Sequence, residues 1–357
     1  MKLYIKFIIN LFLKSFIYTL SIMFCLIFIL NLLTEIDFFK NLDVDFFKPI
    51  YFTILNSPSL IFEMLPFIFL LTTQLFFVSI LKDNQFEIFK YSGIKNLTII
   101  KILAIFSLLI GFFLTIFFYN ISSNLKNFYL SLKSPYTTDD KYLAVITKNG
   151  LWIKDKINQK TLIINSKEIK NNFLINTFIT EFNSNYEIER YIQSDKIDIS
   201  KNNWVVFEPK IYIKNDKIHK DTLEINSNFN YDKIQNLFSN LSSLSIIELN
   251  NLKKNYKQLG YSTVEVDMHI FKLITFPLYF MLLVVFASII MINYKRLKNS
   301  TFIISLGLFL SVLIYYINNF FYVLGSTEKM PIYLSILIPL TTLLLINLVF
   351  INRINER

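Results

Sequence analysis

The sequence has few of the residues on which enzymatic and metal-binding chemistry usually depends. It contains one cysteine, two histidines and six glycines in 357 residues. A single cysteine excludes an internal disulfide and a cysteine-rich metal site. The scattered glycines form no phosphate-binding loop, and neither a G-x-S-x-G nor an H-E-x-x-H motif is present. We therefore expect no catalytic site, no metal and no cofactor, so that a partner or a gradient must drive any work.

Apolar surface, in contrast, is abundant. Hydrophobic residues make up 54% of the chain and 38 residues are Phe, which is more than a soluble core of this length can bury. Because about 20 residues at 1.5 Å rise cross the roughly 30 Å hydrocarbon layer, long apolar runs predict transmembrane helices. The first run is too long for a signal peptide and no small-residue cleavage site follows it. The six runs are 16–33, 59–81, 97–120, 270–292, 301–324 and 332–351.

The basic residues predict how these helices are oriented. The net charge is +10, and Lys and Arg gather at the N-terminus, in segments 82–101 and 295–298, and in the C-terminal tail. Six crossings place all four on one side, which the positive-inside rule assigns to the cytoplasm. The opposite side receives an acidic loop with Glu35 and Asp43. We predict cytoplasmic termini, and the position of the basic residues beside apolar runs favours membrane contact over nucleic-acid binding.

The polar region 121–268 then lies outside the cytoplasm. Short segments rich in β-branched and aromatic residues recur there at intervals of about ten residues, which is typical of a sandwich or jelly roll. We expect strands at 142–147, 151–154, 161–165, 186–192, 204–207 and 210–214, and a short helix at 248–259.

The predicted fold is an α-helical membrane protein with six transmembrane helices and an extracytoplasmic all-β, jelly-roll-like domain. This domain is inserted between the third and fourth helices. The expected boundaries are 1–125 for the first three helices, 126–265 for the β domain and 266–357 for the last three helices.

The cytoplasmic segment between the second and third runs predicts a short helix at about 83–93. Asp83 or Asn84 can cap it, and Gly93 can end it in the left-handed conformation. Its amphipathic pattern comes from Phe86, Glu87, Phe89, Lys90 and Tyr91. Such a helix either inserts into a groove of another protein or rests on lipid headgroups.

Several polar residues lie within the apolar runs. Glu63 must face protein or water, or reach the headgroups from the outer interface. Asn318 and Asn319 are expected to form hydrogen bonds between helices. His269 and Lys272 stand where the fourth run begins, and interfacial anchoring is the simpler interpretation for both.

Lys126 and Lys133 follow the third run at a spacing of seven residues. If the helix continues past the bilayer, the two side chains share a face. Two ammonium groups just outside the bilayer suit the phosphate of a lipid headgroup. Ordinary snorkelling at the interface is the alternative.

In order and topology, these features resemble the LptF/LptG family of lipopolysaccharide export permeases. Pro58 and Pro66 match the two prolines of the family's second helix. Residues 84–93, Asn-Gln-Phe-Glu-Ile-Phe-Lys-Tyr-Ser-Gly, resemble its coupling-helix segment, S-E-L-x-x-x-x-A-S-G. Residues 150–155, Gly-Leu-Trp-Ile-Lys-Asp, resemble the G-L-W-x-K/R-D that opens its β domain. His269, eight residues before Pro277, fits the start of the fourth helix, and this spacing together with the Gly-Leu-Trp segment favours LptG over LptF.

The resemblance covers nearly the whole chain and implies a permease subunit of an ABC-type exporter, without an ATPase site of its own, in a bacterial inner membrane. The implied activity is extraction of lipopolysaccharide from the outer leaflet of that membrane and its passage to a periplasmic β-jelly-roll bridge. The implied partners are an LptF-like second subunit, an LptB-like ATPase dimer, an LptC-like periplasmic protein and lipopolysaccharide itself.

The resemblance also implies two sets of site residues. The ATPase-coupling helix would comprise Gln85, Phe86, Glu87, Phe89, Lys90, Ser92 and Gly93. Here Gln85 stands where the family usually has an acid, which is found instead at Glu87. The expected headgroup contacts are Thr34, Lys40, Lys126 and Lys133. The alternatives are a permease of another lipid or lipoprotein ABC exporter, which usually has four helices, and a non-transport membrane assembly protein with a periplasmic β domain.

Overall fold

The structure is a computed structural model. It describes residues 3–42, 44–82, 85–136, 151–157, 160–170, 172–213, 216–231, 234, 240–259, 262–293 and 300–355. Contacts divide the chain into two units, one formed by Met1–Lys126 with Val264–Arg357 and the other by Asn127–Thr263. Some predicted features lie outside the described residues, namely Asp43, Asp83, Asn84, the strand at 142–147, Gly150, Lys214 and the basic segment 295–298.

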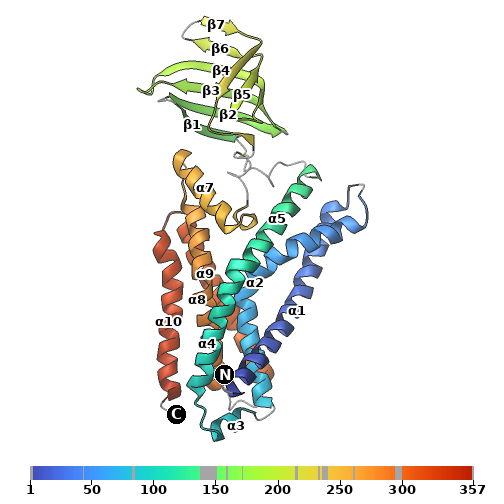
Figure 1. The fold of residues 1–357 in the computed structure, drawn as a ribbon, viewed down its shortest axis with the longest axis vertical. Coiled ribbons are helices and arrows are strands. Elements are labelled where there is room, and N and C mark those ends of the chain that lie inside the picture. The colour runs from blue at the N-terminus through green and yellow to red at the C-terminus, as the bar shows by residue number, and fades with distance from the viewer. Residues whose placement is uncertain are drawn as a thin grey trace. The chain divides into compact units, whose positions relative to one another are not determined.

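Among the described residues, six helices are long and apolar enough to span a membrane. They are α1 (Leu3–Phe39), α2 (Phe47–Lys82), a third helix built from α4 (Asn96–Phe113), η1 (Leu114–Phe118) and α5 (Tyr119–Lys133), then α8 (Val264–Asn293), α9 (Ser300–Ser326) and α10 (Ile332–Asn355). Figure 1 shows these helices in one bundle. Since a β-sheet separates the third and fourth of them in the sequence, the predicted fold class is confirmed.

The helices extend beyond the apolar runs that predicted them. α1 continues to Phe39, so Glu35 belongs to a helix and not to an acidic loop, and it is only 1% exposed. An apolar run ends at its first charge, whereas a helix continues as long as its neighbours satisfy its polar side chains. Here Asn56 of α2 donates a hydrogen bond from Nδ2 to Oδ1 of Asn31 on α1, at 3.1 Å.

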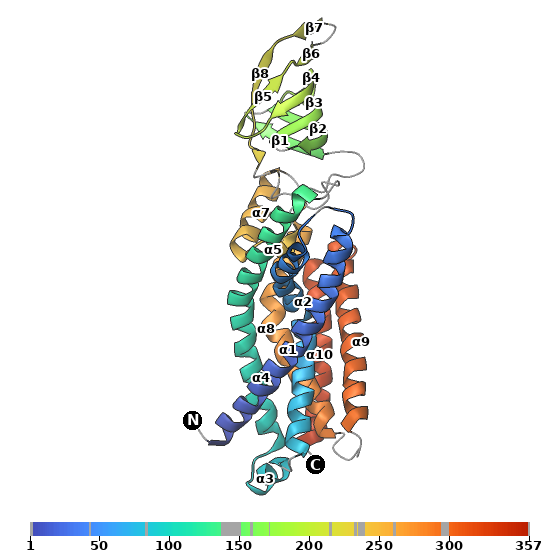
Figure 2. The same ribbon diagram turned by 90° about the vertical axis from the view of Figure 1, so that its right-hand side faces the viewer.

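The core of the helical unit lies where α2 and the third helix meet α8. Phe69 of α2 stacks on Phe280 of α8 with ring centroids 4.7 Å apart. Gly111 of α4 permits a close approach, because a Cβ there would lie 2.9 Å from Cα of Pro277 on α8. Figure 2 shows the described ends of the chain at the same end of the helical unit as the short helix α3 (Gln85–Tyr91).

The second unit contains one antiparallel sheet with eight described strands. These are β1 (Leu151–Ile157), β2 (Lys160–Lys170), β3 (Phe173–Phe182), β4 (Ile188–Asp198), β5 (Asn203–Phe207), β6 (Lys210–Ile213), β7 (Asp216–His219) and β8 (Thr222–Asn226). The order is β1-β2-β3-β4-β5-β8, while β6 pairs with β4 and β7. A helix, α7 (Ile246–Leu259), follows as predicted.

Five of these strands overlap segments predicted from the sequence, and β3, β7 and β8 were missed. β3 escaped prediction because it carries large apolar side chains on both faces, with Leu174 fully buried and Phe178 exposed. The alternation that marks a half-buried strand is therefore weak.

The buried face of the sheet is a ladder of isoleucines. Registered pairing aligns one from each of five strands, each at most 3% exposed: Ile153, Ile164, Ile179, Ile192 and Ile211. On the opposite face, Trp152 and Phe178 are 56% and 51% exposed. The Gly-Leu-Trp segment thus directs its tryptophan away from the core.

Asp155, the acid of the same segment, links β1 to the residues that follow β8, and these are the first and last strands of the order given above. It is fully buried and accepts hydrogen bonds from Ser227 Oγ at 2.8 Å, from the Asn228 backbone N–H at 2.9 Å and from Asn228 Nδ2 at 2.8 Å. Asp155 lies on β1, and Ser227 directly follows β8. The contact therefore fixes the segment after β8 against β1 by side-chain hydrogen bonds.

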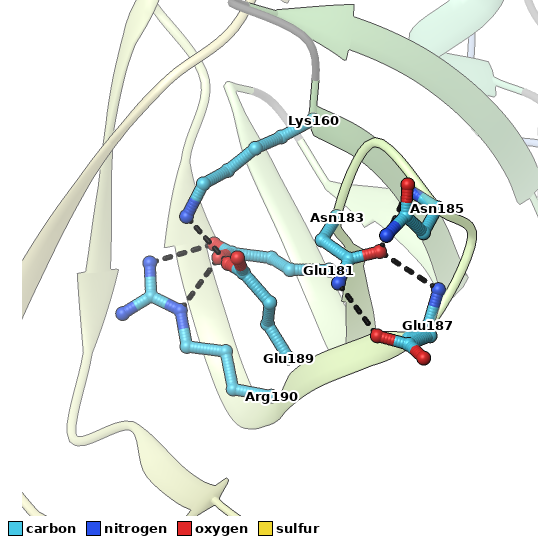
Figure 3. Close-up of polar contacts among 7 residues, drawn as sticks. All are labelled: Lys160, Glu181, Asn183, Asn185, Glu187, Glu189 and Arg190. Atoms are coloured by element: carbon cyan, nitrogen blue, oxygen red, sulfur yellow. Dashed lines mark hydrogen bonds and ion pairs between the residues drawn. The ribbon is translucent and has the colours of Figure 1, made fainter.

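Figure 3 shows the polar contacts that fix the β3–β4 hairpin. Arg190 donates from Nε and Nη2 to the two carboxylate oxygens of Glu181, each at 2.7 Å. In the turn, Asn183 Oδ1 accepts the backbone N–H groups of Asn185 and Glu187, each at 2.9 Å. The bidentate Arg190–Glu181 pair forms only when these two residues face each other across β3 and β4, and the Asn183 side chain fixes the length of the turn. Both contacts therefore set the register of the two strands.

Replacing Asp155 with alanine should loosen the closure of the sheet. The change leaves three donors without their acceptor, at a cost of about 1–3 kcal/mol for each group that stays buried. We expect faster amide hydrogen exchange in β1 and β8 of the full-length protein. Asp195→Ala, at an exposed position of β4, is the matched control, and wild-type exchange in both variants would contradict this role of Asp155.

Candidate functional site

The short helix α3 forms and ends as the sequence predicted. It spans Gln85–Tyr91, and Gly93 follows with φ of 77°. The backbone N–H of Ile94 donates to the carbonyl of Phe89 at 2.9 Å, which is the closing bond of a Schellman motif. A Cβ on Gly93 would meet nothing within 4 Å, so the glycine is required by its backbone conformation and not by crowding.

The faces of α3 differ from the grouping that the sequence suggested. Phe86 is 4% exposed, and the ring of Phe89 lies 5.9 Å from that of Phe7 on α1 in an edge-on contact. Ile88 and Tyr91, in contrast, are 61% and 88% exposed. Phe86 and Phe89 therefore hold α3 against the bundle, while Ile88 and Tyr91 face outward. Glu87, Ser92 and Gly93 are also exposed, Gln85 is half-buried, and the Lys90 side chain lies outside the described set.

A polar cluster lies within the helical unit where α2, α5 and α8 meet. The Tyr119 hydroxyl of α5 and Nε2 of His269 on α8 are hydrogen bonded at 2.9 Å. Nζ of Lys126 on α5 lies 3.9 Å from Oε1 of Glu63 on α2. The sequence was compatible with either a protein contact or a headgroup contact for Glu63. In the structure Glu63 forms this ion pair with Lys126.

A π-helical segment sets the direction of the α5 side chains. η1 spans Leu114–Phe118 and directly precedes Tyr119. One extra residue in a helical turn rotates everything that follows by roughly 100°. Tyr119 and Lys126 face α8 and α2 in this phase, which periodicity along an uninterrupted α-helix does not predict.

The four predicted headgroup contacts differ in their exposure and in their partners within the protein. Thr34 is exposed and donates its hydroxyl to the carbonyl of Leu30 in its own helix, at 3.0 Å, and Lys40 is exposed just after α1. Lys126 and Lys133 lie on one continuous helix, as predicted, yet they are only 9% and 3% exposed. Lys133 Nζ donates to the Tyr129 hydroxyl at 2.7 Å. Both α5 lysines are thus anchored to protein and do not extend freely into solvent.

An apolar cavity of about 300 Å³ lies between α2, α8 and α9. Its walls include Met64, Phe67 and Leu70 of α2, Leu283 of α8 and Val312 of α9. Glu63 also lines it, so the polar cluster reaches the cavity. An apolar space with a charged group at one side suits an amphipathic ligand.

Comparison with known families decides how this arrangement is to be interpreted. The family described as lipopolysaccharide export system permease LptF/LptG matches residues 6–353, nearly the whole chain. The protein belongs to the LptF/LptG family. No individual curated protein matches it. As a member of a permease family with six apolar helices, it is a multi-pass inner-membrane protein of the lipopolysaccharide export machinery, and the family works as a complex with a second permease subunit.

Sequence reasoning missed parts of the site in this LptF/LptG protein. His269 and Lys272 were interpreted as interfacial anchors, but His269 bonds to α5, and Lys272 Nζ lies 5.1 Å from the ring centroid of Tyr322 on α9. Ile88 and Tyr91 were not identified as the exposed pair. The spacing of three between Ile88 and Tyr91 was a usable signal for a shared helix face. No sequence signal marked the π-helical segment.

Proposed function

We propose that the protein is a permease subunit that extracts lipopolysaccharide from the outer leaflet of the inner membrane and passes it to a periplasmic β-jelly-roll bridge. The observation that carries this proposal is the apolar cavity lined at one side by Glu63, whose carboxylate pairs with Lys126, in a chain of the LptF/LptG family. Exposing acyl chains to water costs about 0.8 kcal/mol per CH₂. A lipid leaving the bilayer therefore needs a continuous apolar path with cations for its headgroup.

The isoleucine ladder supports the second half of this path. In this proposal the apolar face formed by five strands, which is covered by protein in this structure, opens to receive acyl chains when the lipid is passed on. We assign residues 126–265 to this periplasmic jelly-roll domain, between membrane segments 1–125 and 266–357. Thr34, Lys40, Lys126 and Lys133 remain the proposed headgroup contacts, with both termini in the cytoplasm.

The energy comes from another chain in this proposal. The coupling segment comprises Gln85, Phe86, Glu87, Phe89, Lys90, Ser92 and Gly93, and its exposed pair, Ile88 and Tyr91, inserts into an LptB-like ATPase dimer. An LptF-like second subunit faces α9, the least covered of the six candidate spans, and completes the wall of the cavity. An LptC-like protein receives the lipid.

Site-specific photo-crosslinking tests the proposal. A photoreactive residue at Met64, which lines the cavity and is 41% exposed, should crosslink to lipopolysaccharide in cells. The same residue at Ile105, which is 60% exposed on α4, should crosslink to bulk phospholipid only. Equal lipopolysaccharide signals at the two positions, or none at Met64, would contradict the assigned path.

A further inference from the structure

A small polar cavity adjoins the apolar cavity within the helical unit. It measures about 70 Å³ and is lined by α8, α9 and α10, with Lys272, Asn318 and Asn319 among its walls. Tyr279 and Tyr315 belong to the walls of both cavities. The polar and the apolar cavity therefore meet at these two tyrosines.

Lys272 lies in this polar cavity between two aromatic rings. Its Nζ is 5.1 Å from the ring centroid of Tyr322 and 5.4 Å from that of Phe276. Each such contact contributes about 0.5–2 kcal/mol, which is less than the several kcal/mol that burying an ammonium group costs. Among the residues that the structure describes, no carboxylate lies within ion-pair distance of this Nζ. The rings of Tyr322 and Phe276 therefore stabilise the Lys272 ammonium group but do not neutralise its charge.

Glu63 is the carboxylate that acts electrostatically on Lys272. Glu63 interacts electrostatically with both Lys272 and Lys126, and it lies 3.9 Å from Lys126. Lys272 and Lys126 both also act electrostatically on His269. Glu265 precedes Lys272 on α8 by two helical turns, about 10 Å. Glu63 thus acts on Lys272 from beyond ion-pair distance while it is paired with Lys126, so the charge of the Lys272 ammonium group favours the entry of an anion.

We infer that the polar cavity binds a phosphate group of the lipid that the permease transports. Lys272 supplies the fixed positive charge, and the side-chain amides of Asn318 and Asn319 donate hydrogen bonds. The acyl chain of the same lipid occupies the apolar cavity beyond Tyr279 and Tyr315. This inference rests on the proposed function and adds a cation on α8 to those expected at Lys40 and on α5.

The test measures binding of lipopolysaccharide to the full-length permease purified with its partner subunit. Lys272→Met removes the charge and keeps the length, whereas Lys272→Arg keeps the charge. A hydrogen bond to a charged group contributes about 1.5–3 kcal/mol, so affinity should fall about ten- to hundredfold in K272M. Affinity should stay near wild type in K272R and in the control K101M, an exposed lysine of α4.

Lipopolysaccharide stripped of its phosphates separates binding from a purely structural role. The wild type should bind this lipid more weakly, and K272M should bind it as the wild type does. Equal losses for both lipids, or unchanged affinity in K272M, would overturn the inference. Should K272M fail to fold, Asn319→Leu is expected to show the same selective loss for the phosphorylated lipid, and a non-selective loss would count against the inference.

Inorganic phosphate alone is the second probe. If the lipid-free permease binds it through Lys272 while K272M leaves lipid affinity intact, the cavity is a free-anion site and the lipid assignment is wrong. Failure of the wild type to bind lipopolysaccharide at all would contradict the proposed function. Wild-type binding with equal binding by the variants would contradict the further inference alone.

Discussion

The double variant I88A/Y91A should lose its ATPase partner. Both side chains are exposed on α3, and truncating central apolar anchors of an interface typically costs about 2 kcal/mol or more, which is over tenfold in affinity. α3 itself should persist, because alanine favours helix and Gly93 still ends it. The measurement is recovery of the ATPase with the tagged permease from solubilised membranes, and we expect a drop of at least about tenfold.

The matched control changes an exposed isoleucine and an exposed tyrosine elsewhere. Ile247 and Tyr186 are 74% and 67% exposed in the β unit, and I247A/Y186A should recover the ATPase as the wild type does. If I88A/Y91A also recovers it fully, the exposed face of α3 is not the docking surface, and a helix that rests on headgroups becomes the better description.

Filling the apolar cavity should block export while leaving the fold intact. Val312 lines the cavity from α9 and is 46% exposed, so a tryptophan at this position enters the cavity with little disturbance of buried packing. We expect V312W to lose most of its lipopolysaccharide crosslinking from Met64 and to fail to support growth. The physical reason is that a cavity of about 300 Å³ has little room for both an indole ring and an acyl chain.

Val349→Trp makes the same change on α10, at a residue that is 54% exposed and does not line the cavity. It should crosslink and grow as the wild type does. Equal defects in both variants would show that the helical unit tolerates no added tryptophan at exposed positions, and equal activity would show that lipid does not pass through the cavity.

The membrane architecture could be predicted from the sequence because each part of it depends on local composition. Apolar runs identified the six spans, and Gly93 identified the end of α3 through a backbone requirement that glycine meets. The strand at β3 was missed because Leu174 and Phe178 place apolar groups on opposite faces, which hides the two-residue period. The end of the first helix was misplaced because Glu35 is a charge buried within that helix.

The candidate site was less predictable because it depends on how distant elements meet. The sequence named Lys126 and Glu63 separately, but their pairing depends on the phase that η1 gives to α5. Likewise, Phe86 and Ile88 are both apolar residues of one short helix, and only the packing of α3 on the bundle determines which is covered. Asp155 shows the same limit, since its three donors come from the segment after β8.

ATP-dependent release of lipopolysaccharide from vesicles tests the central claim most directly. The full-length permease would be reconstituted in lipopolysaccharide-containing vesicles with its second subunit, the ATPase and the periplasmic acceptor, and lipid transferred to the acceptor would be measured over time. The account predicts transfer that requires ATP and is abolished by I88A/Y91A and V312W. Transfer at the wild-type rate in both variants, or an intact wild-type complex that hydrolyses ATP without transferring lipid, would contradict it.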